Sequence, residues 1–85
     1  MNEKEVMTDL FGIEPNWEFA NIQFKDDTYC TLFRSNSEWQ WCNNRKEKMA
    51  LEVDCLSTVN HAIEKLLKIT SHTWKDIELI TDLPF

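Results

Sequence analysis

The chain has 85 residues, of which 42% are hydrophobic and 12% aromatic, and its formal net charge is −6. This length supports one small core and excludes a cofactor domain with a separate substrate domain, so we expect a single compact domain over residues 1–85. The aromatic content is typical of a folded protein, and the negative charge disfavours direct binding to nucleic acid or to anionic membranes.

The acidic residues are concentrated in the first half of the chain. Residues 1–44 contain 3 basic and 8 acidic side chains, whereas residues 45–85 contain 6 and 7. A nucleic-acid-binding protein brings an excess of cations to the phosphates, and this chain has the opposite balance. The pattern favours docking on a basic surface of another protein.

The cysteines and the N-terminal residues indicate a cytoplasmic protein. Three cysteines, Cys30, Cys42 and Cys55, are an odd number, and we find neither a cationic and apolar leader nor an Asn-x-Ser/Thr acceptor. The apolar runs are far shorter than the roughly 20 residues that span a bilayer. We therefore expect free thiols and a soluble chain in a reducing compartment.

Four segments have the composition of strands. Aromatic and branched residues dominate 17–24 and 28–34, and the turn-forming residues 25–27 between them predict a hairpin. A short third strand is expected over 38–42. Apolar residues alternate with acidic ones over 49–54, which predicts a fourth strand with one wet face.

Three helices are expected around these strands. Asn2 and Glu5 resemble a capping box and predict a short opening helix. Ser57 is a suitable N-cap for a second helix over 59–70, where apolar residues recur at spacings of three and four. For 73–80 we favour a short third helix, with an additional edge strand as the alternative.

Together these elements predict an α+β fold, a small antiparallel meander of three to four strands packed on one face by helices, in the order α-β-β-β-β-α-α. Leu83 and Phe85 are expected to pack back on this body. In outline the order resembles double-stranded RNA-binding domains. That family has a lysine-rich start to its second helix, and this chain has instead the residues Ser57, Thr58, Val59, Asn60 and His61.

An enzyme could be built from Cys55 or from Ser57 and His61. A thiol just ahead of a helix N-terminus is activated by the helix dipole, and Ser57 and His61 are one helical turn apart. Asp54 opposes this activation of Cys55, and the same spacing arises from a cap followed by a solvated helix face. We therefore predict that the protein is not an enzyme.

Metal and nucleotide sites are not indicated. Folding could gather Cys42, Cys55, His61 and His72, yet the chain lacks the close Cys-x-x-Cys pairs typical of zinc sites. A single glycine excludes a glycine-rich phosphate loop. We expect no cofactor and no metal.

Trp39 and Trp41 allow two interpretations. They alternate on one strand, so both point to the same face. If helices cover that face, the rings are core residues, the interpretation we favour; otherwise they form an exposed aromatic patch that marks a binding site. Arg45, Lys46 and Lys48 adjoin them and could contact single-stranded nucleic acid, although Glu47 and the net charge favour a solvated loop.

In size, acidity and aromatic content the chain is similar to small inhibitors of nucleases and nucleic-acid machines, such as bacterial immunity proteins and phage anti-defence proteins. The similarity implies a non-enzymatic inhibitor, of the phage anti-defence or immunity and antitoxin type, that docks on a basic, nucleic-acid-binding surface. Our candidate binding residues are the acids Asp26, Asp27 and Glu38 for electrostatic steering, and Trp39 and Trp41 as anchors.

Two alternatives belong to other classes of protein. Small domains often gain burial by association, so the chain could be a homodimeric assembly component that pairs through an exposed sheet edge. A concentration-independent monomer on a sizing column would remove that hypothesis. An enzyme using Cys55 and His61 would be excluded by full function after Cys55→Ser.

Overall fold

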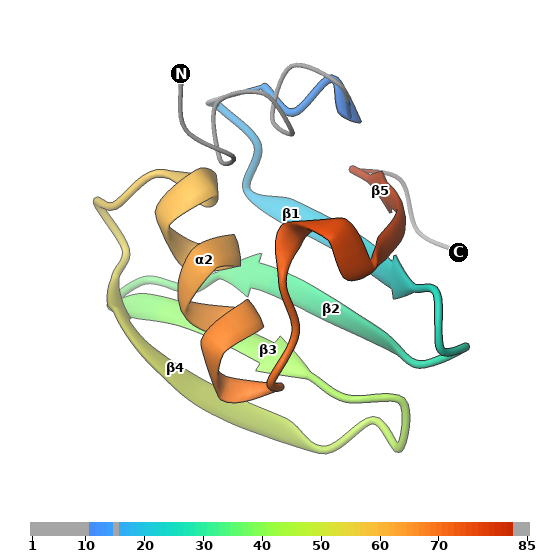
Figure 1. Ribbon diagram of the computed structural model, residues 1–85. Coiled ribbons are helices and arrows are strands. Elements are labelled where there is room, and N and C mark those ends of the chain that lie inside the picture. The colour runs from blue at the N-terminus through green and yellow to red at the C-terminus, as the bar shows by residue number, and fades with distance from the viewer. Residues whose placement is uncertain (1–10, 15, 83–85) are drawn as a thin grey trace.

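The computed structural model describes residues 11–14 and 16–82, which contain a five-stranded antiparallel sheet with the order β4-β3-β2-β1-β5 (Figure 1). One helix and a 3-10 turn accompany it, so the fold is α+β. The elements are β1 (Phe19–Phe24), β2 (Tyr29–Arg34), β3 (Glu38–Cys42), β4 (Lys48–Asp54), α2 (Val59–Ile69), η1 (Trp74–Asp76) and β5 (Ile77–Thr81).

The first four strands confirm the meander expected from the sequence. β1, β2, β3 and β4 pair in succession, each antiparallel to the one before. At the first turn Asp27 has φ 70°, and Asp26 Oδ1 accepts a hydrogen bond of 3.1 Å from Thr28 N. Aspartate tolerates the left-handed region and forms such turns with its own side chain, so local chemistry positions this hairpin.

The core lies between the sheet and α2, which crosses one face of it (Figure 1). Alternate residues of each strand point to this side because successive strand side chains face opposite ways. The residues buried here include Ala20, Ile22, Phe24, Leu32, Trp39, Trp41, Leu51 and Val53 from the sheet, and Val59, Ala62, Ile63, Leu66 and Leu67 from α2. The apolar stripe predicted for this helix is therefore confirmed.

The N-cap of α2 differs from the prediction. Thr58, and not Ser57, caps the helix, and its Oγ1 accepts a hydrogen bond of 3.3 Å from His61 N. Ser57 belongs to the preceding turn, where its N–H donates to the Asp54 carbonyl at 3.0 Å, and it is the Thr58 carbonyl that accepts the first helical bond, from Ala62 N at 3.1 Å. Among the described residues, no helix is long and apolar enough to cross a membrane.

The third helix predicted over 73–80 is wrong, and the alternative of an edge strand is correct. Only Trp74–Asp76 form a 3-10 turn, and Ile77–Thr81 then pair with β1. This strand hydrogen-bonds the outer edge of β1. A bulge opposite Gln23 and Phe24, where Glu78 is the extra residue, lets Ile77 and Ile80 both point into the core. The opening helix and the packing of Leu83 and Phe85 fall outside the described residues.

Candidate functional site

Trp39 and Trp41 belong to the core. Trp39 has no exposed surface and Trp41 is 7% exposed, which confirms the core interpretation of the pair. Trp39 also donates from Nε1 to the Ser57 carbonyl at 3.1 Å. Because neither ring is accessible, we do not retain the two tryptophans as anchors for a partner.

The three steering acids are not brought together. Asp26 and Asp27 are exposed at the β1–β2 turn, whereas Glu38 begins β3 at the opposite end of the sheet (Figure 1). Successive turns of a meander alternate between the two ends, so the two turns cannot share a surface. Each end must therefore be considered separately.

One end of the sheet, which we call the acidic end, is formed by residues 16–18, 34–38 and 52–58. It comprises the segment entering β1, the β2–β3 turn and the β4–α2 loop (Figure 1). Contacts between backbones confirm that these segments adjoin: Arg34 N donates to the Glu18 carbonyl at 2.9 Å, and Glu38 pairs directly with Asp54. The acidic side chains here are Glu18, Glu38, Glu52 and Asp54.

Arg34 is the single cation in these three segments. Its guanidinium lies 4.8 Å from the centroid of the Trp39 ring, and Nη2 donates to the Ser57 carbonyl at 3.2 Å. The positive charge is thus directed to the indole face and a backbone carbonyl. The carboxylates at this end have no other lysine or arginine within the same segments to balance them, so the acidic end carries an excess of negative charge.

The opposite end, which we call the mixed end, is formed by residues 25–28, 43–48 and 68–76. Its six cations outnumber its four acids. It holds an open pocket of about 550 Å³ between the β1–β2 turn and the loop after α2, lined by Lys25, Asp26, Thr70, Ser71, His72 and Asp76.

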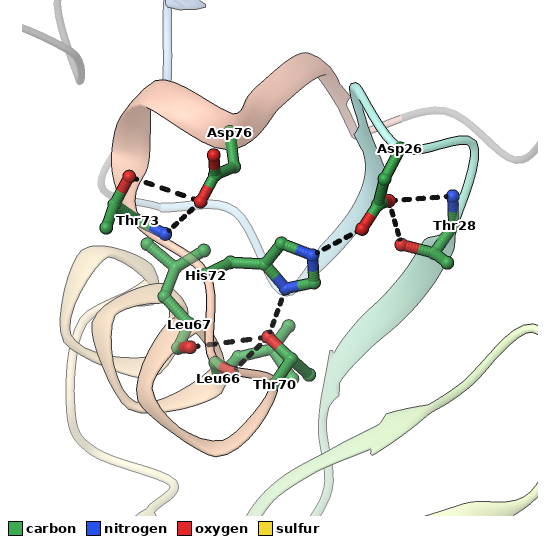
Figure 2. A network of polar contacts seen from close by, with 8 residues as sticks. All are labelled: Asp26, Thr28, Leu66, Leu67, Thr70, His72, Thr73 and Asp76. Atoms are coloured by element: carbon green, nitrogen blue, oxygen red, sulfur yellow. Dashed lines mark hydrogen bonds and ion pairs between the residues drawn. The ribbon is translucent and has the colours of Figure 1, made fainter.

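His72 is the centre of a polar network in this pocket (Figure 2). Its Nε2 contacts Asp26 Oδ2 at 3.0 Å, and Nδ1 contacts Thr70 Oγ1 at 2.9 Å. The imidazole also stacks on Phe24, with ring centroids 3.8 Å apart and planes within 4°. The network joins the end of α2 to the β1–β2 turn, two segments that are far apart in sequence.

The order hydroxyl, imidazole, carboxylate in Thr70, His72 and Asp26 is also that of hydrolase triads. Here the Thr70 hydroxyl donates to the Leu66 carbonyl at 2.9 Å, an acceptor of the last helical turn that also accepts from Thr70 N at 3.0 Å (Figure 2). Its proton is directed to the helix and away from the imidazole. The arrangement therefore favours a structural clasp at the helix end over a nucleophile.

Two groups near this network have shifted pKa values. Hydrogen bonds from the Thr28 side chain, followed by that from His72, lower the pKa of Asp26 to about 2. Burial, with a smaller effect from Asp26, raises the pKa of the Cys30 thiol to about 11. Asp26 is thus held as a carboxylate, and Cys30 as a protonated, unreactive thiol.

The other residues considered for chemistry are dispersed. Cys55 Sγ donates to the Asn36 carbonyl at 3.5 Å, and His61 is exposed on the first turn of α2. All three cysteines are free thiols. Within residues 11–14 and 16–82, no group of three histidine, cysteine or acidic side chains is placed to hold a metal ion.

The feature that sequence reasoning missed is Leu56. It lies in the β4–α2 loop and is 89% exposed, far more than any other large apolar side chain among the described residues. A signal was present: Leu56 falls outside both the alternation of 49–54 and the apolar stripe of the helix. No comparable signal connected Asp26 with His72, which lie 46 residues apart.

Comparisons with known proteins place the chain in no family. No protein-family model, no curated protein and no solved structure matches it. Its function is therefore inferred from the arrangement of its own side chains.

Proposed function

We propose that the protein is a small non-enzymatic inhibitor that docks through its acidic end on a basic, nucleic-acid-binding surface of a larger protein. The observation that carries the proposal is the distribution of charge: four carboxylates and one cation at the acidic end, against four acids and six cations at the mixed end. A surface of this sign is complementary to a surface that normally receives phosphates.

The contacts of Arg34 strengthen this argument. An arginine among four acids would ordinarily form ion pairs and reduce the field, but here the guanidinium lies over Trp39 and bonds the Ser57 carbonyl. Glu38 and Asp54 are directly paired neighbours of like charge, an arrangement that costs stability. An excess of negative charge that opposes folding is understandable if the end is used for binding.

Capture followed by competition tests the proposal. The tagged chain is used as bait in lysate of its own source cells at low and at high ionic strength, and the recovered protein is then purified. We expect a basic protein that is recovered only at low ionic strength, because salt screens surface charges. Added nucleic acid should displace the chain from it.

Two results would contradict the proposal. One is a partner that binds the chain and nucleic acid at the same time, because the two would then occupy different surfaces. The other is capture that is insensitive to ionic strength, which would show that charge does not guide the association.

The β4 edge of the sheet gives the homodimer hypothesis little support. β4 is one edge strand, and Glu52 within it has φ 63° at an irregularity in the pairing with β3. Lys48, Glu52 and Asp54 are exposed along the same strand. Bulges and charged residues on an edge oppose pairing with a second sheet. A sizing column over a range of concentrations distinguishes the two hypotheses.

A further inference from the structure

Leu56 combines exposure with a fixed position. It is 89% exposed, whereas the other exposed large apolar side chains, Tyr29, Ile69 and Leu79, are between 40% and 47% exposed. A leucine this accessible gains nothing from burial in the folded chain. An isolated exposed leucine on a mobile loop would need no explanation. Leu56 is therefore informative only if its loop is well ordered.

Hydrogen bonds fix the backbone on both sides of Leu56. Asp54 Oδ1 accepts from Leu56 N at 2.7 Å, and the Asp54 carbonyl accepts from Ser57 N at 3.0 Å. Cys55 N donates to the Ser37 carbonyl at 3.4 Å, which ties the loop to the β2–β3 turn. The turn that carries the leucine is thus closed by its own residues and attached to a neighbouring one.

The Ser57 carbonyl, one residue beyond Leu56, accepts two further hydrogen bonds from the body of the sheet. Trp39 Nε1 donates at 3.1 Å and Arg34 Nη2 at 3.2 Å. Trp39 is fully buried, so its indole is immobilised by packing. Arg34 stacks on that indole and is fixed in turn. The loop is therefore braced against the core while its leucine points to solvent.

We infer that Leu56 is the apolar anchor of the acidic end, and that it inserts into an apolar socket bordered by lysines or arginines on a protein partner. The inference rests on the proposed function and specifies the contact surface. Interfaces commonly gain most of their affinity from a few buried side chains surrounded by polar groups. A preordered leucine loses little conformational freedom on binding, and Glu38 and Asp54 supply the acidic border.

Arg34 and Trp39 act as positioning residues in this inference, because each donates a hydrogen bond to the Ser57 carbonyl next to Leu56. Arg34→Lys removes the planar group that both stacks and donates, and Trp39→Phe removes the N–H while keeping an aromatic ring. Both variants keep the Leu56 side chain, and we expect both to make its loop more mobile.

Backbone relaxation of the ¹⁵N-labelled full chain tests the brace. The Leu56 amide should have an order parameter near that of the strands, about 0.85, and a lower value in Arg34→Lys and Trp39→Phe. A value below about 0.6 in the unaltered chain would overturn the inference, because the leucine would then not be preordered.

Titration of the full chain with synthetic peptides tests the anchor. One probe has lysines and arginines flanking a Phe-Leu pair, a second has serines in place of that pair, and a third replaces the cations by glutamates. We expect the first to perturb amide signals in 34–38 and 54–58, and the others to bind at least about 10-fold more weakly. Leu56→Ala should weaken the first by about 10-fold, and the control Leu79→Ala should not.

The possible outcomes show whether only the anchor is wrong or whether the proposed function is wrong as well. If Glu18→Lys with Glu38→Lys abolishes binding of the first probe and Leu56→Ala does not change it, the anchor is wrong and the acidic end remains the docking surface. If neither change affects binding of the first probe, or if its signals map outside 34–38 and 54–58, both the anchor and the proposed function are wrong.

Discussion

Both ends of the sheet combine charged and aromatic side chains, but the two ends use them in different ways. At the acidic end a cation and an indole hold a loop, and the surrounding carboxylates have no cationic neighbours except Arg34 within the same segments. At the mixed end a carboxylate, an imidazole and a hydroxyl bond one another and clasp the end of α2 (Figure 2). The polar groups at the mixed end satisfy one another, whereas the acids at the acidic end are left unbalanced and form the surface that we propose for a partner.

The brace at the acidic end should be the part most sensitive to mutation. Trp39→Ala removes a fully buried ring and the donor to Ser57, so we expect a loss of about 3–5 kcal/mol in the free energy of unfolding. Urea denaturation measures it, with Leu79→Ala as a surface control that should change stability by less than about 0.5 kcal/mol. A loss below about 1 kcal/mol for Trp39→Ala would contradict the assigned core.

The next largest effect concerns Cys30, close to the mixed end. Because burial raises its thiol pKa to about 11 from an ordinary 9.0, the reactive thiolate should be about 100-fold scarcer at mildly alkaline pH than in the unfolded chain. Iodoacetamide labelling followed by mass spectrometry should modify the partly exposed Cys42 and Cys55 first. Labelling of Cys30 as fast in the folded chain as in urea would refute this.

The clasp at the mixed end should contribute less than the core. His72→Ala removes the stack on Phe24 and the contacts with Asp26 and Thr70, and we expect a loss of about 1–2 kcal/mol. His61→Ala is a matched control, since that histidine is exposed and should change stability by less than about 0.5 kcal/mol. Equal losses in the two variants would show that the clasp does not stabilise the fold.

The smallest effect is the acid sensitivity of Asp26. Its folded pKa, about 2, lies below the ordinary 3.8, so its stabilising contribution is fully present above about pH 4 and is lost as the pH falls through 2. NMR should place the midpoint of its carboxyl titration near pH 2. In Asp26→Asn, the signals of Thr28 and His72 should no longer change over that range; a midpoint near 3.8 in the unaltered chain would exclude the hydrogen bonds.

The sequence predicted the strands and α2 because their patterns are local. Alternation placed Trp39 and Trp41 on one face, and apolar spacing placed Leu66 and Leu67 toward the core. The helix predicted over 73–80 was wrong because a short apolar run fits a helix or a strand equally well. The strand forms because 77–81 pair with an edge of β1 that would otherwise be unpaired.

The site was harder to predict than the fold. Asp26 and Glu38 are both turn acids in the sequence, yet the alternation of turns in the meander separates them to opposite ends. The contact of Asp26 with His72, and the brace of Ser57 by Arg34, join segments whose proximity no local pattern encodes.

The most direct measurement is the association rate of the captured partner with two charge-matched variants over a range of ionic strengths. Glu18→Lys with Glu38→Lys alters the acidic end, and Glu47→Lys with Glu78→Lys alters exposed acids elsewhere by the same charge. We predict that the first pair slows association by about 10-fold or more and flattens its salt dependence, while the second pair changes it less than about 3-fold. If both pairs slowed association equally, or if neither pair slowed it, the acidic end would not be the docking surface.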